Sequence, residues 1–259
     1  MQNPLDMTDK VILVTGGPRG VGRGNCLRFL EAGANVVMCA RRDADEPVEA
    51  AGRKALFVEA NVKELDAIDR VIGFTTERFG HLDVLVNNAG GAPAADAATA
   101  SPRFSESIIQ LNLLSALHFS QKANAVMQQQ DEGGSIISIS SVSALRPSPG
   151  TAAYGAAKAG LLSLTQSLAV EWAPKVRINA VTAGMIQTEL AHLHYGDEDT
   201  IEKVAATVPL GRLGTPRDIG DTCLYLASPL ASYVSGANLL VHGGGEKPAF
   251  LGAAEPQSN

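Results

Sequence analysis

A run of buried-strand character that ends in a glycine-rich turn constrains the fold of this chain most. Residues 11–14 are apolar, mostly β-branched and uncharged, which is typical of a strand covered on both faces. A glycine-rich turn over residues 15–22 follows directly, then a helical stretch that stops at Gly33, and then a second apolar run over residues 36–40. Strand, turn, helix and strand make a βαβ unit, whose crossover requires a parallel sheet with helices on its faces.

The same alternation continues along the chain. Helices are expected over residues 64–79, with Leu65, Ile68 and Val71 on one apolar face, over residues 105–130, and from Tyr154 to near residue 174. Strands are expected at residues 11–14, 36–40, 55–58, 84–86, 135–139, 176–181 and 239–241. We therefore predict an α/β fold with a parallel sheet of about seven strands and helices on both faces, and no linker that divides the chain.

Composition narrows the classes of partner. The formal net charge of −6 argues against nucleic acid or an anionic membrane as the main partner. Because no apolar run is long enough to cross a bilayer and the first ten residues lack the layout of a secretory signal, we expect a cytoplasmic protein. The widely spaced Cys26, Cys39 and Cys223 each lie among apolar residues, which indicates buried reduced thiols and neither a disulfide framework nor a zinc site.

Tyr154 and Lys158 are the residues to which we assign proton chemistry. They stand four apart, so on a helix both side chains project from one face. An ammonium near a phenol favours the phenolate and moves the pKa of the phenol down from about 10 toward the working pH. Such a pair also arises by chance on ordinary helices, so other motifs must decide its meaning.

The glycine turn suggests a binding site for a dinucleotide. Glycines between a strand and a helix let the backbone approach a pyrophosphate, and the helix N-terminus offers unpaired N–H groups. The spacing here is Gly-x-x-x-Gly-x-Gly and not the usual Gly-x-Gly-x-x-Gly, so a purely structural turn remains an alternative on this motif alone.

Several motifs occur together in a fixed order. They are Thr15-Gly16-x-x-x-Gly20-x-Gly22, Asn87-Asn88-Ala89-Gly90, Asn112, Ser141 and Tyr154-x-x-x-Lys158. Over residues 10–245 this ordered set resembles the short-chain dehydrogenase/reductase family. The resemblance implies a single doubly wound, Rossmann-type domain over residues 1–259 that uses a nicotinamide dinucleotide.

The resemblance also implies a role for each of four catalytic residues. Tyr154 would be the general acid in carbonyl reduction and the base in alcohol oxidation. Lys158 would lower the pKa of Tyr154 and hold the nicotinamide ribose. Ser141 would hydrogen-bond the substrate oxygen, and Asn112 would position a water that passes protons toward Lys158. No metal is implied.

The remaining implied positions form the cofactor site. They are Gly16, Arg19, Gly20, Val21, Gly22, Arg41, Arg42, Asn61, Val62, Asn88, Ala89, Gly90, Tyr154, Lys158, Gly184, Ile186 and Thr188.

The end of the second strand bears on the choice of cofactor. Ala40 stands where an acidic residue would accept from ribose hydroxyls, and Arg41 and Arg42 follow it. Guanidinium groups suit a phosphate, so NADP(H) is favoured over NAD(H). Asp43 and Asp45 nearby act against this preference, and NAD(H) stays possible.

Three positions depart from the family's usual pattern. Asn61 replaces a common aspartate that meets the adenine amino group, although an amide oxygen can accept the same bond. Ala183-Gly184 replaces a frequent Pro-Gly, which implies a less rigid loop. His242 replaces an aspartate before the last glycines, away from the proposed chemistry.

Two segments are expected to border the substrate. Residues 188–213 would be a lid and substrate wall, whereas residues 246–259 form a C-terminal tail. In the lid, His192 and His194 lack accompanying carboxylates or thiols at ligand spacing, so we interpret them as surface or pocket residues. Arg146 would either pair with an acidic group of the substrate, such as a carboxylate or a coenzyme A phosphate, or be solvated.

The predicted function is therefore an NADP(H)-dependent oxidoreductase of the ketoreductase type, which interconverts a ketone and a secondary alcohol of a small molecule. One alternative is an enoyl-thioester reductase on the same fold, and another is a non-catalytic dinucleotide-sensing protein. The family also implies a homo-oligomer, commonly a tetramer.

Overall fold

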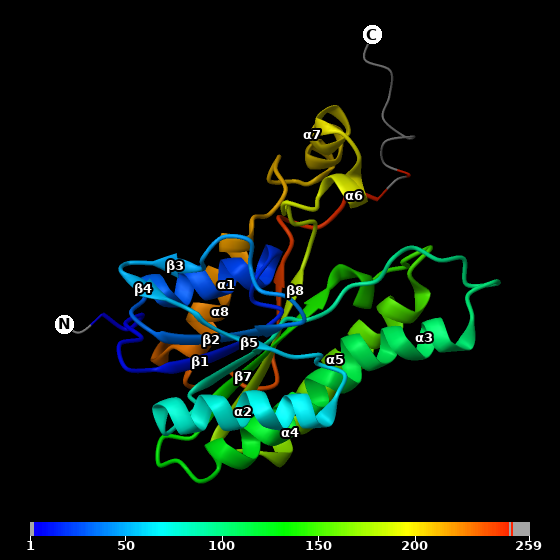
Figure 1. Ribbon diagram of the computed structural model, residues 1–259. Coiled ribbons are helices and arrows are strands. Elements are labelled where there is room, and N and C mark those ends of the chain that lie inside the picture. The colour runs from blue at the N-terminus through cyan, green and yellow to red at the C-terminus, as the bar shows by residue number, and fades with distance from the viewer. Residues whose placement is uncertain (1–2, 249, 251–259) are drawn as a thin grey trace.

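The apolar runs of the sequence form one parallel sheet in the computed structural model, which describes residues 3–248 and 250 (Figure 1). The strands that belong to this sheet within those residues are β1 (Val11–Thr15), β2 (Asn35–Ala40), β5 (Leu56–Glu59), β6 (Val84–Asn87), β7 (Gly134–Ser141), β8 (Val176–Ala183) and β9 (Asn238–Val241). Each predicted strand is confirmed, with ends shifted by one or two residues.

The strand order places two loop-bearing strand ends side by side. The order across the sheet is β5-β2-β1-β6-β7-β8-β9, and all neighbouring strands are parallel. The chain runs outward from β1 in one direction and from β6 in the other. In open α/β sheets a ligand binds at the carboxyl ends of the strands where the order reverses, which here is between β1 and β6.

Helices cover both faces of the sheet. Helices α1 and α8 pack together on one face, whereas α2, α4 and α5 pack on the other (Figure 1). The helical elements are α1 (Gly20–Glu31), α2 (Leu65–Phe79), α3 (Pro102–Ile109), a π-helical turn (Gln110–Leu114), α4 (Ser115–Met127), a 3₁₀ turn (Val142–Ala144), α5 (Ala152–Glu171), α6 (His192–Tyr195), α7 (Glu198–Thr207), α8 (Pro216–Ala227) and a second 3₁₀ turn (Pro229–Ala231). The doubly wound fold is thus confirmed.

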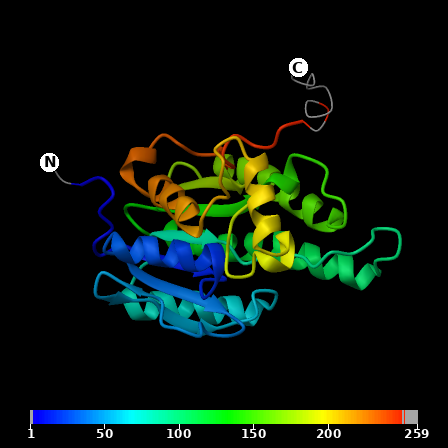
Figure 2. The same ribbon diagram turned by 90° about the horizontal axis from the view of Figure 1, so that it is seen from above.

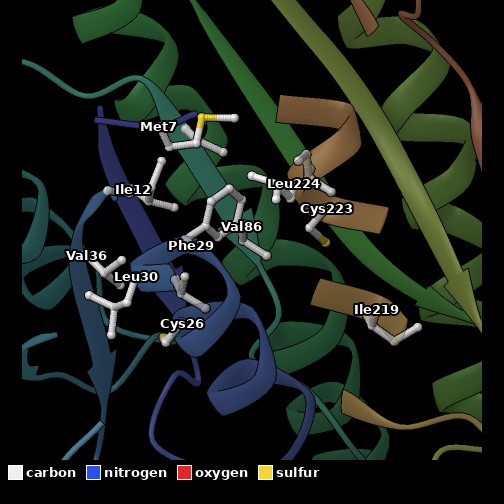
Figure 3. Close-up of a cluster of buried hydrophobic side chains, with 14 of the residues drawn as sticks. Met7, Ile12, Cys26, Phe29, Leu30, Val36, Val86, Ile219, Cys223 and Leu224 are labelled. Carbon is white, nitrogen blue, oxygen red and sulfur yellow. The ribbon is translucent and has the colours of Figure 1, made fainter. Parts of the chain in front are cut away.

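The core between α1, α8 and the sheet fixes how the glycine turn is held. Phe29 and Leu30 of α1 are fully buried in this core, to which Ile219 and Leu224 of α8 also belong (Figure 3). Burying each such side chain contributes about 1.5–3 kcal/mol. The helices approach closely because α1 has a glycine at position 24, where an added Cβ would lie 2.5 Å from Pro216. This packing anchors α1, and with it the turn that precedes it.

Three features differ from the sequence-based expectations. A two-stranded hairpin that was not predicted, β3 (Glu49–Ala50) and β4 (Arg53–Lys54), follows β2 and precedes β5 in the sequence, and it forms a sheet of its own. Leu65 is 53% exposed because it begins α2, so only Ile68 and Val71 of the predicted face are buried. The helix expected over residues 105–130 is present from Pro102 to Met127, but it contains a π-helical turn between α3 and α4 that the sequence did not predict.

Two further segments are the one between β8 and α8 and the C-terminal residues. The 188–213 segment, which contains α6 and α7, extends from the carboxyl end of β8, beyond the layers of the sheet (Figure 1). Of the predicted tail over residues 246–259, all but residues 246–248 and 250 lie outside the described residues. Across the described residues, no helix combines the length and the apolar character needed to span a membrane.

Candidate active site

Ser141 and Tyr154 meet at the carboxyl end of the sheet. Ser141 is the last residue of β7, where its hydroxyl accepts a hydrogen bond from the Ser143 N–H at 3.2 Å and opens the 3₁₀ turn that follows. Tyr154 lies in the first turn of α5 and is half-buried. The two side chains share a hydrogen bond. A phenol and an aliphatic hydroxyl therefore lie together at the carboxyl end of the sheet.

Lys158 lies one helical turn beyond Tyr154 and beneath it. Its side chain is buried, with 4% exposed, and its ammonium donates to the Ile139 carbonyl at 2.7 Å. The Nζ atom lies 5.6 Å from the centroid of the Tyr154 ring. Burial lowers the pKa of Lys158 to about 8. The i, i+4 pair predicted from the sequence thus projects from one face of α5 toward the sheet.

The pKa of Tyr154 corrects one expectation. We expected the neighbouring ammonium to lower it, but burial raises the pKa of Tyr154, and only the hydrogen bond with Ser141 opposes this rise. The physical reason is desolvation, which disfavours the phenolate. The same burial lowers the pKa of Lys158 and so disfavours its charged form. In the chain alone, Tyr154 is therefore a protonated donor across the neutral range.

Asn112 is a buried asparagine whose amide group is fully hydrogen-bonded. It is 1% exposed and sits in the π-helical turn, an irregularity that is frequent at functional sites. Its Oδ1 accepts from the Gly91 N–H at 2.7 Å, and its Nδ2 donates to the carbonyls of Gly91 and Ile108, both at 2.9 Å. A Cβ added to Gly90 would lie 2.7 Å from Asn112 Oδ1 and 3.2 Å from Lys158 Nζ. Asn112 and Lys158 therefore border the same point beside β6.

The glycine turn is tied to the end of β6 by Asn88. The Asn88 Nδ2 donates to the carbonyls of Thr15 and Gly16, at 2.9 and 3.3 Å. In return, Thr15 Oγ1 accepts from the N–H groups of Asn88 and Ala89, each at 3.0 Å. Asn88 thus fixes the shape of the turn with the side chain that we had assigned to the cofactor.

The turn itself leaves the start of α1 open to an anion. Gly16 and Gly20 have φ values of +69° and +53°, a region that favours glycine. Arg19 is the N-cap of α1, and its side chain makes no capping hydrogen bond. The Gly20 N–H instead donates at 2.9 Å to a carboxylate oxygen of Glu189. Because a carboxylate from another segment already binds there, these donors suit the pyrophosphate of a dinucleotide. When bound, that cofactor supplies the hydride.

The basic residues expected at the adenosine end behave in two ways. Arg41 and Arg42 are exposed and have no ion-pair partner within the part of the chain that the structure describes. Arg19 pairs with Asp45 at 3.0 Å. The guanidinium of Arg23 donates to backbone carbonyls of the loop before β3, which holds this loop against α1. Two of the three expected arginines therefore stay free of competing carboxylates.

The other predicted cofactor positions follow β5 and β8. The Asn61 Oδ1 accepts from the Lys63 N–H at 3.3 Å, and the Val62 side chain is buried in the core. Gly184 packs against His242, since an added Cβ would lie 2.7 Å from its Cα. Ile186 forms a bridge with Gly214. Thr188 reaches the glycine turn, with its methyl group 3.4 Å from where a Gly20 Cβ would lie. Val21 is half-buried in the first turn of α1.

Two features near Tyr154 escaped the sequence analysis. Arg146 forms an ion pair with Glu246 at 2.6 Å, so it is neither simply solvated nor free for a substrate. Tyr195 of α6 lies close enough that the charges of Arg146, Glu246 and Tyr154 affect its pKa, although burial is the main cause of its raised pKa. No local pattern relates Arg146 to a residue 100 positions away.

The sequence analysis also did not predict a small cavity that lies beside Tyr154. It has a volume of about 70 Å³ and is lined mostly by small side chains, from the 92–100 loop and from residues 150–153, together with Phe104 and Ile108. The alanine-rich composition of this loop was the signal available in the sequence. His192 is exposed at the start of α6, and the His194 side chain lies outside the described part of the structure.

Comparison with known proteins supplies the family context. A family model described as enoyl-(acyl carrier protein) reductase matches residues 16–246. The L-rhamnose 1-dehydrogenase (NAD(P)(+)) of Azotobacter vinelandii is 37% identical over 92% of this chain and 97% of its own length. The 3alpha-hydroxysteroid dehydrogenase of Mediterraneibacter gnavus is 34% identical over 92% and 97%, respectively.

A solved structure agrees over almost the whole chain. The short-chain type dehydrogenase/reductase from Mycobacterium marinum superposes with a TM-score of 0.86 at 31% identity, covering 94% of this chain and 98% of its own. The similarity therefore extends over the sheet, both helical layers and the segments that border Tyr154.

Proposed function

Because the chain belongs to the short-chain dehydrogenase/reductase family, we propose that it interconverts a ketone and a secondary alcohol, with Tyr154 as the general acid or base. Its relatives include dehydrogenases, one of them named as dependent on NAD(P)(+), and this chain is likewise an oxidoreductase that acts on alcohol or carbonyl groups. The observation that carries the finer proposal is the contact of Tyr154 with Ser141 above a buried Lys158.

Proton transfer follows from this arrangement. In carbonyl reduction, the Tyr154 hydroxyl gives its proton to the substrate oxygen as that oxygen gains charge. Ser141 donates a hydrogen bond to the same oxygen and stabilises the developing negative charge. The phenolate that remains lies beside the Lys158 ammonium, whose charge in the chain alone does not offset the burial of Tyr154. In alcohol oxidation the phenolate takes the proton back. Asn112 keeps the 90–91 backbone beside Lys158 throughout.

The cofactor of the proposal is NADP(H). Exposed Arg41 and Arg42 follow β2, and no carboxylate of the described chain pairs with them. A 2′-phosphate would gain two guanidinium partners at this position. NAD(H) is the alternative, since Asp45 neutralises Arg19 nearby.

An enoyl-thioester reductase is the second candidate, because the matching family model has that description. Two observations favour carbonyl chemistry. The Tyr154 and Lys158 pair is intact on one helix face, whereas enoyl reductases of this fold usually rearrange it. The similar curated relatives are named for the oxidation of hydroxyl groups.

The proposed assembly is a homotetramer in the cytoplasm. Leu239 and Leu240 of the edge strand β9 are 38% and 45% exposed, and Val170 of α5 is 80% exposed. Such apolar surface on an edge strand and a long helix suits contact with identical subunits. The buried free thiols Cys26, Cys39 and Cys223 suit a reducing compartment.

The test is a substrate panel run with Tyr154→Phe. Purified protein is assayed with NADPH and NADH against ketones, 3-ketoacyl thioesters, enoyl thioesters, steroids and aldoses. We expect turnover of a carbonyl or alcohol substrate, and a loss of about 10²-fold or more in the kcat of Tyr154→Phe, in a variant that still binds NADPH. Tyr225→Phe on α8, also half-buried but remote, is the control and should keep wild-type rates.

Two outcomes would overturn the proposal. Full activity in Tyr154→Phe would remove the assigned proton donor. Reduction of enoyl thioesters alone, with every ketone inert, would instead make the second candidate correct.

A further inference from the structure

Glu189 occupies the anion-binding end of α1. Its Oε1 accepts a hydrogen bond at 2.9 Å from the N–H of Gly20, the first residue of that helix. The two residues are 169 positions apart, and Glu189 belongs to the 188–213 segment. Seen from above, the yellow part of the chain projects over the region of the blue helix α1 (Figure 2), whereas the side view shows α6 and α7 farther from the sheet (Figure 1). A contact of this kind joins the substrate side of the molecule directly to the glycine turn.

The chemistry of the contact resembles that of a phosphate. α1 has no side-chain cap from Arg19 and no acidic residue in its first turn, so its first N–H groups depend on an outside acceptor. The carboxylate of Glu189 supplies both an oxygen acceptor and a negative charge at the positive end of the helix dipole. The pyrophosphate of a dinucleotide needs the same donor and the same charge complement.

No ion pair explains why the Glu189 carboxylate lies at the start of α1. Its carboxylate forms no ion pair with any residue of the described chain, and Arg19, the nearest basic residue in sequence to Gly20, pairs with Asp45 instead. The neighbouring Thr188 packs on the turn, with its methyl group 3.4 Å from the position of a Gly20 Cβ. The Gly20 N–H is thus the partner that the structure provides for this charge.

We propose that Glu189 competes with the cofactor pyrophosphate for the Gly20 N–H, so that it sets cofactor affinity and links the position of the 188–213 segment to cofactor entry. The proposal rests on the dinucleotide binding of the proposed function. While the carboxylate is in place, the chain is in a state that does not accept the pyrophosphate. Apparent affinity is then reduced by the fraction of molecules in the open state, and repulsion between carboxylate and phosphate reduces it further.

The expected effect is a gain in binding. A carboxylate at an exposed helix N-terminus is typically stabilised enough to change an equilibrium about two- to fivefold. Removing it should tighten the dissociation constants of NADPH and of inorganic pyrophosphate by about that factor. Glu189→Gln keeps an acceptor oxygen and removes the charge, whereas Glu189→Ala removes both, so the alanine variant should show the larger gain.

The experiment is a titration of the full chain, followed by calorimetry and by NADPH fluorescence. Glu202→Gln is the matched control, because it removes the same charge from exposed α7 of the same segment, and among the described residues Glu202 forms no hydrogen bond or ion pair with α1. We expect tighter binding of both probes in the two Glu189 variants and a change below about twofold in Glu202→Gln. Amide exchange at residues 20–22 without cofactor should also accelerate in Glu189→Ala, because one N–H loses its acceptor.

The outcomes separate this inference from the proposed function. Unchanged or weaker binding of NADPH and pyrophosphate in Glu189→Ala would overturn the competition. An equal gain in Glu202→Gln would overturn it as well, since general charge would then explain the effect. Full activity of Tyr154→Phe together with tighter binding in Glu189→Ala would overturn the catalytic assignment alone.

Discussion

The Lys158 ammonium lies 5.6 Å from the centroid of the Tyr154 ring and is held from the other side by the Ile139 carbonyl at 2.7 Å. Lys158 is thus fixed between the sheet and the phenol, in a site where burial lowers its pKa to about 8. The cost of keeping this charge inside the protein should be measurable as a dependence of stability on pH.

The first prediction concerns this dependence. The pKa of Lys158 is about 8 in the fold and 10.5 when the side chain is free, so between these values the unfolded chain binds more protons. The free energy of unfolding of the wild type should therefore rise with pH across this window, by about 1.4 kcal/mol per pH unit from this group. Urea denaturation at several pH values, compared with Lys158→Met, isolates the contribution. Lys54→Met, which removes an exposed ammonium, should follow the wild type. Parallel curves for wild type and Lys158→Met would contradict the lowered pKa.

Asn112 provides the second prediction. Asn112→Ala leaves the Gly91 N–H and two backbone carbonyls without their partners, so we expect a loss of about 2 kcal/mol or more in the free energy of unfolding. Turnover should fall as well, because the 90–91 backbone loses its fixed position beside Lys158. Asn124→Ala, on α4 and half-buried, is the control and should change both quantities little. Wild-type kcat in a folded Asn112→Ala would remove Asn112 from the site.

The parts of the fold that could be predicted depend on local patterns. Uncharged β-branched runs identify buried strands, because a parallel sheet covered on both faces excludes charge. The β3 and β4 hairpin was missed because its turn residues, Ala51 and Gly52, lack the Asn-Gly or Asp-Gly signal, although both adopt positive φ values. The π-helical turn at Asn112 follows from tertiary hydrogen bonds to Gly91, which no helical periodicity contains.

The site shows the same division. Ser141, Tyr154 and Lys158 are brought together because a strand end and the next helix fix their geometry. Two contacts near the site join residues far apart along the chain: Glu189 meets Gly20 across 169 positions, and Glu246 meets Arg146 across 100. Such pairs depend on how loops pack, and a single sequence carries no signal for that packing.

Arg41 and Arg42 provide the third prediction. If they bind a 2′-phosphate, the double variant Arg41→Ala, Arg42→Ala should weaken NADPH binding by about tenfold or more, since hydrogen bonds to charged groups contribute about 1.5–3 kcal/mol. NADH binding should be nearly unchanged. The measurement is the ratio of the two dissociation constants. Arg103→Ala, which removes an exposed charge at the start of α3, is the control.

The Arg19 ion pair sharpens this prediction. Asp45 pairs with Arg19 at 3.0 Å, and both side chains are at least half exposed. Asp45→Asn should free Arg19 and shift the ratio further toward NADPH. A double arginine variant that binds NADPH and NADH with the wild-type ratio would contradict NADP(H) as the preferred cofactor.

Asn25 provides the fourth prediction, which concerns stability. Its side chain is fully buried in α1, and neither its amide nitrogen nor its amide oxygen has a hydrogen-bond partner among the described residues. Burying an amide without partners costs about 1–3 kcal/mol, so removing it in Asn25→Ala should offset the loss of packing. We expect a free energy of unfolding equal to that of the wild type or up to about 1 kcal/mol higher.

The matched control is Asn179, a buried asparagine whose amide groups are satisfied. It donates to the Val234 carbonyl at 2.8 Å and accepts from the Ala237 N–H at 3.0 Å. Asn179→Ala should lower the free energy of unfolding by about 2 kcal/mol or more, because it leaves both backbone groups unpaired. Urea denaturation of the two variants under the same conditions gives the comparison. Equal losses in both would mean that Asn25 is hydrogen-bonded in solution, for example to a buried water, and would contradict the unpaired state.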